Sequence, residues 1–424
     1  TIYHTTLAAK ILSIIINKAA SFDPEGIGLE MEAGKPDWYD ALNGLPALLG
    51  SSLSETLELK RLALYLQTHL SKETEISIPV ETKRFLDQLK EQLTKTKNPF
   101  SYWEKTFQLK EDFRQKTKFG VSGRESTLGP KELEAFLDKV IGKCDQGIKK
   151  CLKKYKNYHT YFINKVEGSH NNQTPLPLFL EGFVHALKVE KDKKIYGRVK
   201  KSPLYDKELK MYKVNASLEE TPTEIGRARI FIPGWLENES IWLHMEYKYM
   251  LELLKAGLYK EFFTDLKNVM VPFLDPQKYK RSILENSSFL VSSAHPNPAN
   301  HGRGFVARLS GATAEFVDMW LLMTTGKNIF SLDKNGQLRF KLSPILPAWL
   351  FKDKKLSFTL LGSIKVTYEN PKGKNTFGSG GVSPISYTLK LDHKEITINK
   401  SFIPEAYAKM IRARQVYEIV VKLG

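Results

Sequence analysis

Two acidic residues flank a tryptophan and a tyrosine in the segment Asp37-Trp38-Tyr39-Asp40. The flat apolar face of a tryptophan suits a sugar ring, and a carboxyl group packed against such a face has its ionised form disfavoured. A carboxyl group with a raised pKa can act as a general acid near neutral pH. The same residues also suit a capped turn, in which Asp37 or Asp40 accepts backbone N–H groups and Trp38 lies in the core. On this segment alone the two interpretations have equal weight.

A second acidic segment combines a carboxylate, a tryptophan and a histidine, and it reads Glu237-Asn238-Glu239-Ser240-Ile241-Trp242-Leu243-His244. Glu237 and His244 are seven residues apart, so a helix that begins near Asn238 would place them on one face. The imidazole could then donate a hydrogen bond to an oxyanion. The alternative is an N-terminal glutamate that favours the helix dipole and a core histidine with satisfied hydrogen bonds. For this segment alone the alternative is the stronger interpretation.

A third segment, Ser310-Gly311, opens a predicted helix over Ala312–Thr325. A turn at a helix N-terminus presents backbone N–H groups and a hydroxyl, and the helix dipole favours an anion there. The alternative is an ordinary N-cap, with Glu315 completing a capping box.

In this order the three segments resemble the short motifs of the cellobiose- and chitobiose-phosphorylase family of glycoside phosphorylases. The resemblance implies that Asp40 is the general acid. It also implies substrate contacts at Asp37, Trp38, Tyr39, Glu237, Asn238 and Trp242, and phosphate contacts at His244, Ser310 and Gly311.

The chain departs from the family pattern at several positions. Tyr39 stands where the family has asparagine, and Glu239-Ser240 where it has Gly-Gly. Ser310 replaces a threonine, and only one residue separates Pro347 from Trp349 in the family's Leu-Pro-x-x-Trp motif. These changes make cellobiose itself doubtful as a substrate. A long insert over Lys95–Asn172 is similar to that of larger relatives that act on β-1,2- or β-1,3-linked oligoglucosides.

The resemblance implies inverting phosphorolysis of a β-linked glucooligosaccharide, which yields α-glucose 1-phosphate and a shortened sugar. Inorganic phosphate is then the co-substrate, with no other cofactor and no metal. Thr1 leads directly into a helical pattern, so we expect a longer enzyme whose N-terminal portion is a partner of this chain. Relatives of this family are commonly homodimers, which makes a homodimer the expectation here.

Two other functions remain open from the sequence. An inverting β-glucan hydrolase of similar shape needs a second carboxylate as base, which Glu237, Glu285 or Glu315 could provide. A non-catalytic fragment could instead bind β-glucan through its tryptophans, Trp38, Trp235 and Trp242.

Helical periodicity dominates the chain up to about residue 330. The predicted helices are Ile2–Ala20, Ser54–Leu70, Val80–Thr94, Pro130–Tyr155, Leu178–Val189, Ile241–Ala256 and Ala312–Thr325. Long loops between several of them hold the unusual residues, which favours a mainly α fold, an incomplete (α/α)6 toroid, over residues 1–330. Residues 331–424 are predicted as a small all-β domain. Its predicted strands are Gln337–Leu342, Leu356–Leu361, Ile364–Tyr368, Ser386–Leu391 and Glu395–Asn399.

Composition excludes several classes of protein. The net charge is +17, but the lysines are scattered and form no motif with aromatic residues, so we expect a solvated basic face and no nucleic acid partner. No apolar run approaches the ~18 residues of a membrane-spanning helix. Cys144 and Cys151 lie roughly 10 Å apart on a predicted helix, too far for a disulfide. Two thiols without other ligands make no zinc site, and they indicate a reducing, cytoplasmic compartment.

Overall fold

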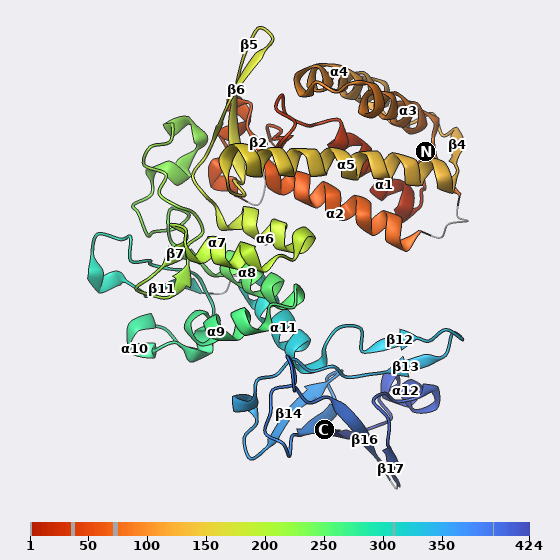
Figure 1. Cartoon of the computed structure of the whole chain (residues 1–424), viewed down its shortest axis with the longest axis vertical. Coiled ribbons are helices and arrows are strands. Elements are labelled where there is room, and N and C mark those ends of the chain that lie inside the picture. The colour runs from red at the N-terminus through yellow and green to blue at the C-terminus, as the bar shows by residue number, and fades with distance from the viewer. Residues whose placement is uncertain (1, 35–38, 71–74, 308–309, 393) are drawn as a thin grey trace. The chain divides into compact units, whose positions relative to one another are not determined.

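A computed structural model describes residues 2–34, 39–70, 75–307, 310–392 and 394–424 (Figure 1). The described chain is 45% helix and 20% strand, with several small sheets among its helices, which is a mixed α/β fold. The predicted mainly α fold with an (α/α)6 toroid is therefore wrong. Its error lies in the region before residue 330, where short or polar strands lack the alternating apolar pattern that would have marked them.

The described residues group into two units by their contacts. The first unit consists of Thr1–Ala256 with Asn268–Leu309, and the second of Gly257–Lys267 with Ser310–Gly424. The predicted boundary between residues 330 and 331 stays a prediction.

Helices of the first unit begin at residues suited to a helix start. The Thr6 side chain caps α1 by accepting from the Ala9 N–H at 3.1 Å. Asn98 caps α4 in the same way, and Pro130 occupies the first position of α5. The helices are α1 (Leu7–Ala19), α2 (Leu53–His69), α3 (Val80–Lys95), α4 (Pro99–Thr117), α5 (Pro130–Tyr155), α6 (Leu180–Glu190), α7 (Lys193–Lys200), α8 (Leu243–Lys255) and α10 (Pro276–Tyr279).

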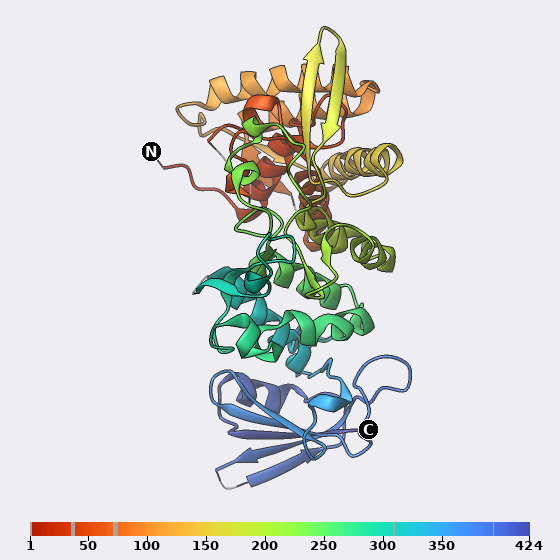
Figure 2. The same ribbon diagram turned by 90° about the vertical axis from the view of Figure 1, so that its left-hand side faces the viewer.

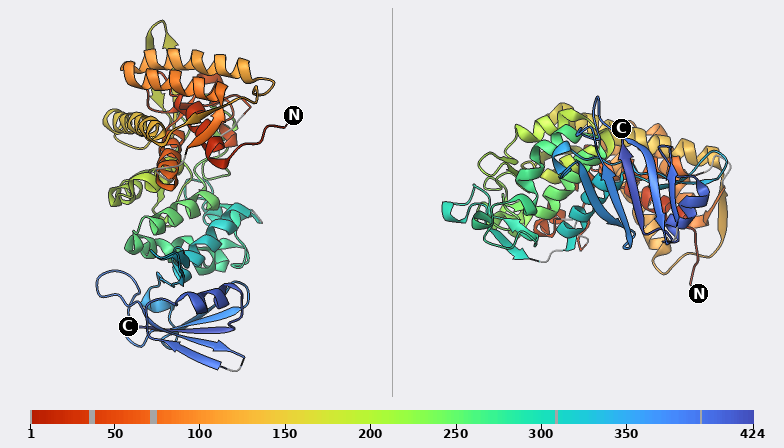
Figure 3. Two further views of the ribbon diagram at one scale, coloured as in Figure 1. Left: turned by 90° about the vertical axis from the view of Figure 1, so that its right-hand side faces the viewer. Right: turned by 90° about the horizontal axis from the view of Figure 1, so that it is seen from below.

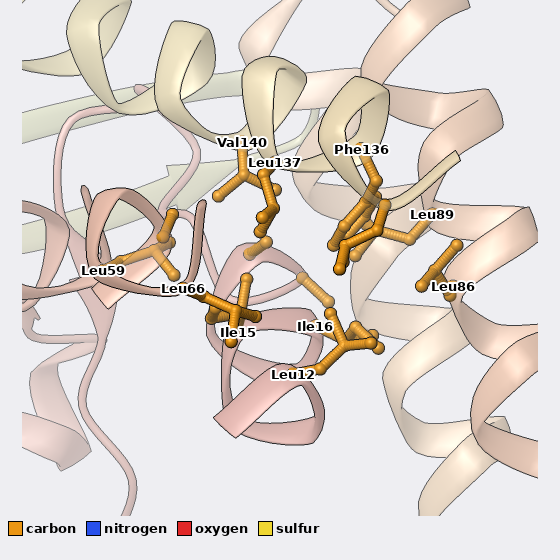
Figure 4. Packing of buried hydrophobic residues seen from close by; sticks show 14 of the residues in the cluster. Leu12, Ile15, Ile16, Leu59, Leu66, Leu86, Leu89, Phe136, Leu137 and Val140 are labelled. Atoms are coloured by element: carbon orange, nitrogen blue, oxygen red, sulfur yellow. The ribbon is translucent and has the colours of Figure 1, made fainter. Parts of the chain in front are cut away.

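The main core of the first unit lies between α1, α2, α3 and α5 (Figure 4). Apolar side chains at helical spacing on each of these helices point toward one another, and full burial of one such side chain contributes about 1.5–3 kcal/mol. α4 lies against α3, as the left-hand view of Figure 3 shows. The labelled core residues are Leu12, Ile15, Ile16, Leu59, Leu66, Leu86, Leu89, Phe136, Leu137 and Val140.

Small antiparallel sheets connect these helices. One sheet has the order β1 (Leu29–Glu30), β2 (Ser51–Ser52), β5 (Tyr161–Glu167), β6 (His170–Pro175). Its β5–β6 hairpin extends beyond the helices of the unit (Figure 2). A second sheet has the order β11 (Gly304–Ala307), β10 (Ser287–Leu290), β9 (Ile241–Trp242). The remaining strands form two pairs, β3 (Ile76–Pro79) with β4 (Glu125–Leu128) and β7 (Tyr205–Asp206) with β8 (Met211–Tyr212).

The second unit is built around a five-stranded sheet whose strands lie side by side in the right-hand view of Figure 3. β15 and β18 are parallel, and the other neighbours are antiparallel. The predicted strands are found as β13 to β17, whereas β18 was not predicted. The order of strands in this sheet is β14 (Lys355–Leu360), β15 (Ile364–Glu369), β18 (Glu418–Leu423), β16 (Pro384–Leu391), β17 (Lys394–Ile398). A separate pair is formed by β12 (Phe330–Leu332) and β13 (Leu338–Phe340). The helices of the unit include α11 (Ser310–Thr325) and α12 (Glu405–Arg412). α9 (Tyr259–Val269) lies mostly in this unit.

Among the described residues, no helix combines the length and the apolar character that crossing a bilayer would require.

Candidate active site

Asp40 begins a short 3₁₀ helix, η1 (Asp40–Leu42), and its side chain is 60% exposed. The Arg227 guanidinium lies 3.3 Å from its carboxylate, and Arg227 begins another 3₁₀ helix, η4 (Arg227–Ile230). The two short helices are in contact. The positive charge of Arg227 therefore lies directly beside the Asp40 carboxyl group.

Two glycines allow these short helices to approach each other. A Cβ at Gly44 would lie 1.7 Å from the Glu224 carbonyl oxygen, and a Cβ at Gly226 would lie 2.4 Å from that of Ala41. The Gly44 N–H also donates to the Ile225 carbonyl at 3.1 Å. No other residue type fits this close backbone contact without a shift, so these glycines hold Arg227 beside Asp40.

Glu237 is the second carboxylate of the site. It lies in a turn over residues 236–240, which we call the Glu237 turn, and its side chain is partly buried. Burial and, after it, the adjacent negative charge of Asp40 raise the pKa of Glu237 to about 7, against the opposing charge of Arg227. Glu237 therefore keeps its proton up to near neutral pH.

A buried tyrosine and a buried asparagine fix the backbone at Glu237. The Tyr39 hydroxyl donates to the Glu237 carbonyl oxygen. Asn215 Nδ2 donates to the Tyr39 hydroxyl at 2.9 Å and to the Glu237 carbonyl at 2.8 Å, and Asn215 Oδ1 accepts from the Glu239 N–H at 2.6 Å. Burial raises the pKa of Tyr39 well above its usual value, so its hydroxyl keeps the proton it donates. We call this arrangement the Tyr39–Asn215 clamp.

The clamp stabilises a strained turn. Leu236 and Glu239 both have left-handed backbone conformations, with φ values of 48° and 59°. Such conformations cost on the order of 1–2 kcal/mol each for residues other than glycine. A salt bridge of 2.7 Å between Lys213 and Glu239 adds to the hydrogen bonds that offset this cost. Glu239 has a Cβ, unlike glycine, so its left-handed conformation depends on these side-chain contacts.

Aromatic side chains lie close to the Glu237 turn along the chain. Trp242 on β9 stacks on Phe289 of β10, with ring centroids 5.9 Å apart and planes at 6°. Trp235 meets Phe289 and Phe305 edge to face, at 5.1 Å and 4.6 Å. Both tryptophans are half-buried, so each keeps some ring surface that a sugar could contact.

The predicted helical pairing of Glu237 with His244 is wrong. α8 begins at Leu243 and not near Asn238, so Glu237 precedes the helix and shares no helical face with His244. The strand β9 and the strained turn occupy the intervening residues. His244 lies in the first turn of α8 and is half-buried, and its phosphate contact stays a prediction.

The remaining predicted site residues lie in several different parts of the chain. Asn238 is buried, and its Nδ2 donates to the Phe231 carbonyl at 2.7 Å. Ser310 and Gly311 begin α11 in the second unit, and their phosphate contacts also stay predictions. Asp37 and Trp38 lie outside the described residues.

Arg227 and Asn215 were not among the site residues predicted from the sequence. Neither residue lies in a sequence motif. Each reaches the site through a tertiary contact with a distant segment, Arg227 with Asp40 and Asn215 with Tyr39. The one available signal was Gly226 directly before Arg227, and a lone glycine indicates a turn without saying what it approaches.

Comparison with models of known protein families and with curated proteins finds no match for this chain. The site is therefore defined by its own features: Asp40, the neighbouring Glu237 with its raised pKa, Arg227 beside Asp40, and the Tyr39–Asn215 clamp on the Glu237 backbone.

Proposed function

We propose that this chain contains the general acid of an inverting glycoside phosphorylase that cleaves β-linked glucooligosaccharides. Asp40 is the proton donor to the glycosidic oxygen, and Glu237 shares that proton with it. The observation that supports this proposal most is the pKa of Glu237, which burial and the neighbouring negative charge of Asp40 raise to about 7. A carboxyl that keeps its proton near neutrality is what protonation of a leaving group needs.

In the proposed step, a phosphate oxygen forms a bond to the anomeric carbon as the bond to the glycosidic oxygen breaks. The carboxyl pair transfers its proton to that leaving oxygen. Phosphate attacks from the opposite face, so the product is α-glucose 1-phosphate together with a sugar one residue shorter. His244, Ser310 and Gly311 are the proposed phosphate ligands, and Glu237, Asn238 and Trp242 belong to the proposed sugar site.

An inverting hydrolase needs a second carboxylate to activate water. Inorganic phosphate is already a nucleophile, so the proposed phosphorylase needs no such base.

The same proposal includes a homodimer and a cytoplasmic location. Cys144 and Cys151 are buried free thiols, which agrees with a reducing compartment. Burial raises the pKa of Cys151 to about 12, so this thiol is unreactive at neutral pH.

The test is to incubate the protein with β-1,2-, β-1,3- and β-1,4-linked glucooligosaccharides, with and without inorganic phosphate. Proton NMR identifies the products and the configuration at the anomeric carbon. We expect sugar release only with phosphate, with α-glucose 1-phosphate as product. Release of free glucose without phosphate would instead establish a hydrolase. Binding without any product, lost on changing Trp235 or Trp242 to alanine, would identify a non-catalytic glucan-binding chain.

A further inference from the structure

The residue directly before α6, Phe179, contacts both members of the Tyr39–Asn215 clamp. Its ring packs edge to face against the ring of Tyr39, with centroids 5.2 Å apart and planes at 90°. Its backbone lies opposite that of Asn215 in an isolated antiparallel bridge. Two backbone hydrogen bonds, of 3.0 Å and 2.8 Å, close this bridge on either side. One residue therefore supports the tyrosine through its side chain and the asparagine through its backbone.

A second aromatic contact fixes the Phe179 ring. The ring also packs edge to face against Tyr161 of β5, with centroids 5.1 Å apart and planes at 88°. The Tyr161 hydroxyl in turn donates to the carboxylate of Glu181, a buried residue of α6, at 2.6 Å. Tyr39, Phe179 and Tyr161 are each at most 1% exposed. In a close-packed interior these three rings have little freedom to shift unless one of them is removed.

Contacts with two other segments anchor α6 and thereby the position of Phe179. A Cβ at Gly182 would lie 2.6 Å from the Tyr158 carbonyl oxygen, so the first turn of α6 lies against that backbone more closely than any other residue type allows. Further along α6, His185 Nδ1 lies 2.6 Å from the Glu58 carboxylate of α2. The ring of Phe179 therefore extends toward the clamp from a helix that its neighbours hold in place.

We propose that Phe179 is a positioning residue, which holds the clamp in the arrangement that fixes the Glu237 backbone. The inference rests on the proposed function, because it assigns Phe179 to the site that contains the proposed general acid. Without the ring, Tyr39 gains space to turn away from the Glu237 carbonyl, and the strained turn opens to water. The Glu237 carboxyl group is then less buried, so its pKa falls toward the ordinary value of 4.5.

The test compares two phenylalanines of the same segment that are both fully buried, Phe179 and Phe183. Phe183 packs edge to face against Tyr158 and not against the clamp, so Phe183→Leu is the matched control for Phe179→Leu. Each background is prepared with and without Glu237→Gln, and urea unfolding is measured at pH 4 and pH 8. The difference between the stabilisation by Glu237→Gln at the two pH values reports the pKa of Glu237 in that background.

We expect Phe179→Leu to raise the acid dissociation constant of Glu237 about tenfold, which lowers its pKa and reduces the pH-dependent stabilisation by Glu237→Gln. The wild type and Phe183→Leu should keep the full pH-dependent stabilisation. Phe179→Met fills similar space with a flexible side chain, and it gives the same comparison where Phe179→Leu does not fold. Equal pH-dependent stabilisation in the Phe179 and Phe183 backgrounds would overturn the proposal, because Phe179 would then be an ordinary core residue.

The readout is unfolding and not sugar release. The test of Phe179 therefore gives its answer whether or not the chain cleaves a glucooligosaccharide with phosphate, and failure of one proposal is distinguishable from failure of the other.

Discussion

Asp23 and Glu237 are both carboxyl groups of the first unit whose pKa is raised by burial, but their surroundings differ. Asp23 is fully buried and accepts four hydrogen bonds. The donors are the Ile27 N–H (2.9 Å), the Gly28 N–H (2.8 Å), Ser51 Oγ (2.7 Å) and Gln173 Nε2 (2.8 Å). Glu237 instead has a second carboxyl group, Asp40, as its neighbour.

The difference indicates how to distinguish a carboxylate that stabilises the fold from one that could take part in a reaction. The donors around Asp23 tie together the loop at residues 23–28, β2 and β6, and they leave no acceptor for a ligand. The fold directs donors to the Glu237 backbone but places a like charge beside its carboxyl group. Burial alone therefore does not identify a candidate reactive carboxyl group, whereas burial together with a neighbouring like charge does.

The largest expected effect is on activity at the exposed member of the carboxyl pair. Asp40→Asn should lower turnover by about a thousandfold or more, ~4 kcal/mol, because the substrate loses its proton donor. Its free energy of unfolding should change by less than about 0.5 kcal/mol, since the side chain is mostly exposed. The measurement is phosphate-dependent sugar release. Glu224→Gln, a nearby exposed residue of the Gly226 loop, is the control. Undiminished turnover in Asp40→Asn would remove Asp40 from the role.

The next effect is on stability at the structural carboxylate. Asp23→Ala should lower the free energy of unfolding at pH 7 by about 3 kcal/mol, because it leaves four buried donors without an acceptor. Urea unfolding of the wild type and the variant measures this difference. A decrease in the free energy of unfolding below about 1 kcal/mol would show that water replaces the carboxylate. Asp23 would then not be a residue that stabilises the fold.

Glu237→Gln should raise the free energy of unfolding, whereas Asp23→Ala should lower it. Between its ordinary pKa of 4.5 and its folded pKa of about 7, Glu237 binds more protons in the folded state than in the unfolded state. Stability is therefore lost as the pH rises through that window, and the charged group destabilises the fold above it. Glu237→Gln should stabilise the protein by about 2 kcal/mol at pH 8 and by almost nothing at pH 4. Unfolding experiments at both pH values test this, and equal effects at the two would contradict the raised pKa.

The smallest effect is expected from the clamp. Tyr39→Phe removes the hydroxyl that donates to the Glu237 carbonyl, which should let the strained turn relax and lower turnover about tenfold. The alkaline limb of the pH–rate profile, set near pH 7 by the carboxyl pair, should shift as well. Tyr102→Phe is a matched control, because Tyr102 is a buried tyrosine whose hydroxyl donates to the Ala19 carbonyl away from this site. An unshifted limb in Tyr39→Phe would leave the clamp with a structural role only.

Local patterns identified much of the secondary structure. α2, α3 and α5 begin and end within one residue of their predicted bounds, because a continuous apolar stripe and end signals such as Pro130 act within a few residues. α4 was missed because Tyr102, Thr106 and Lys110 form its buried face, which is not an apolar stripe. The β5–β6 hairpin was missed because strands such as His170–Pro175 are polar. The fold class was wrong for that reason.

The sequence by itself determined which residue types were available: Asp40, Glu237 and the tryptophans near them. Only the tertiary structure decided which of these meet. The contact of Asp40 with Arg227 requires two loops to approach at Gly44 and Gly226, and the position of Glu237 depends on a clamp from Tyr39 and Asn215. Burial and neighbouring charge set a pKa, and both arise only when segments distant along the chain pack together.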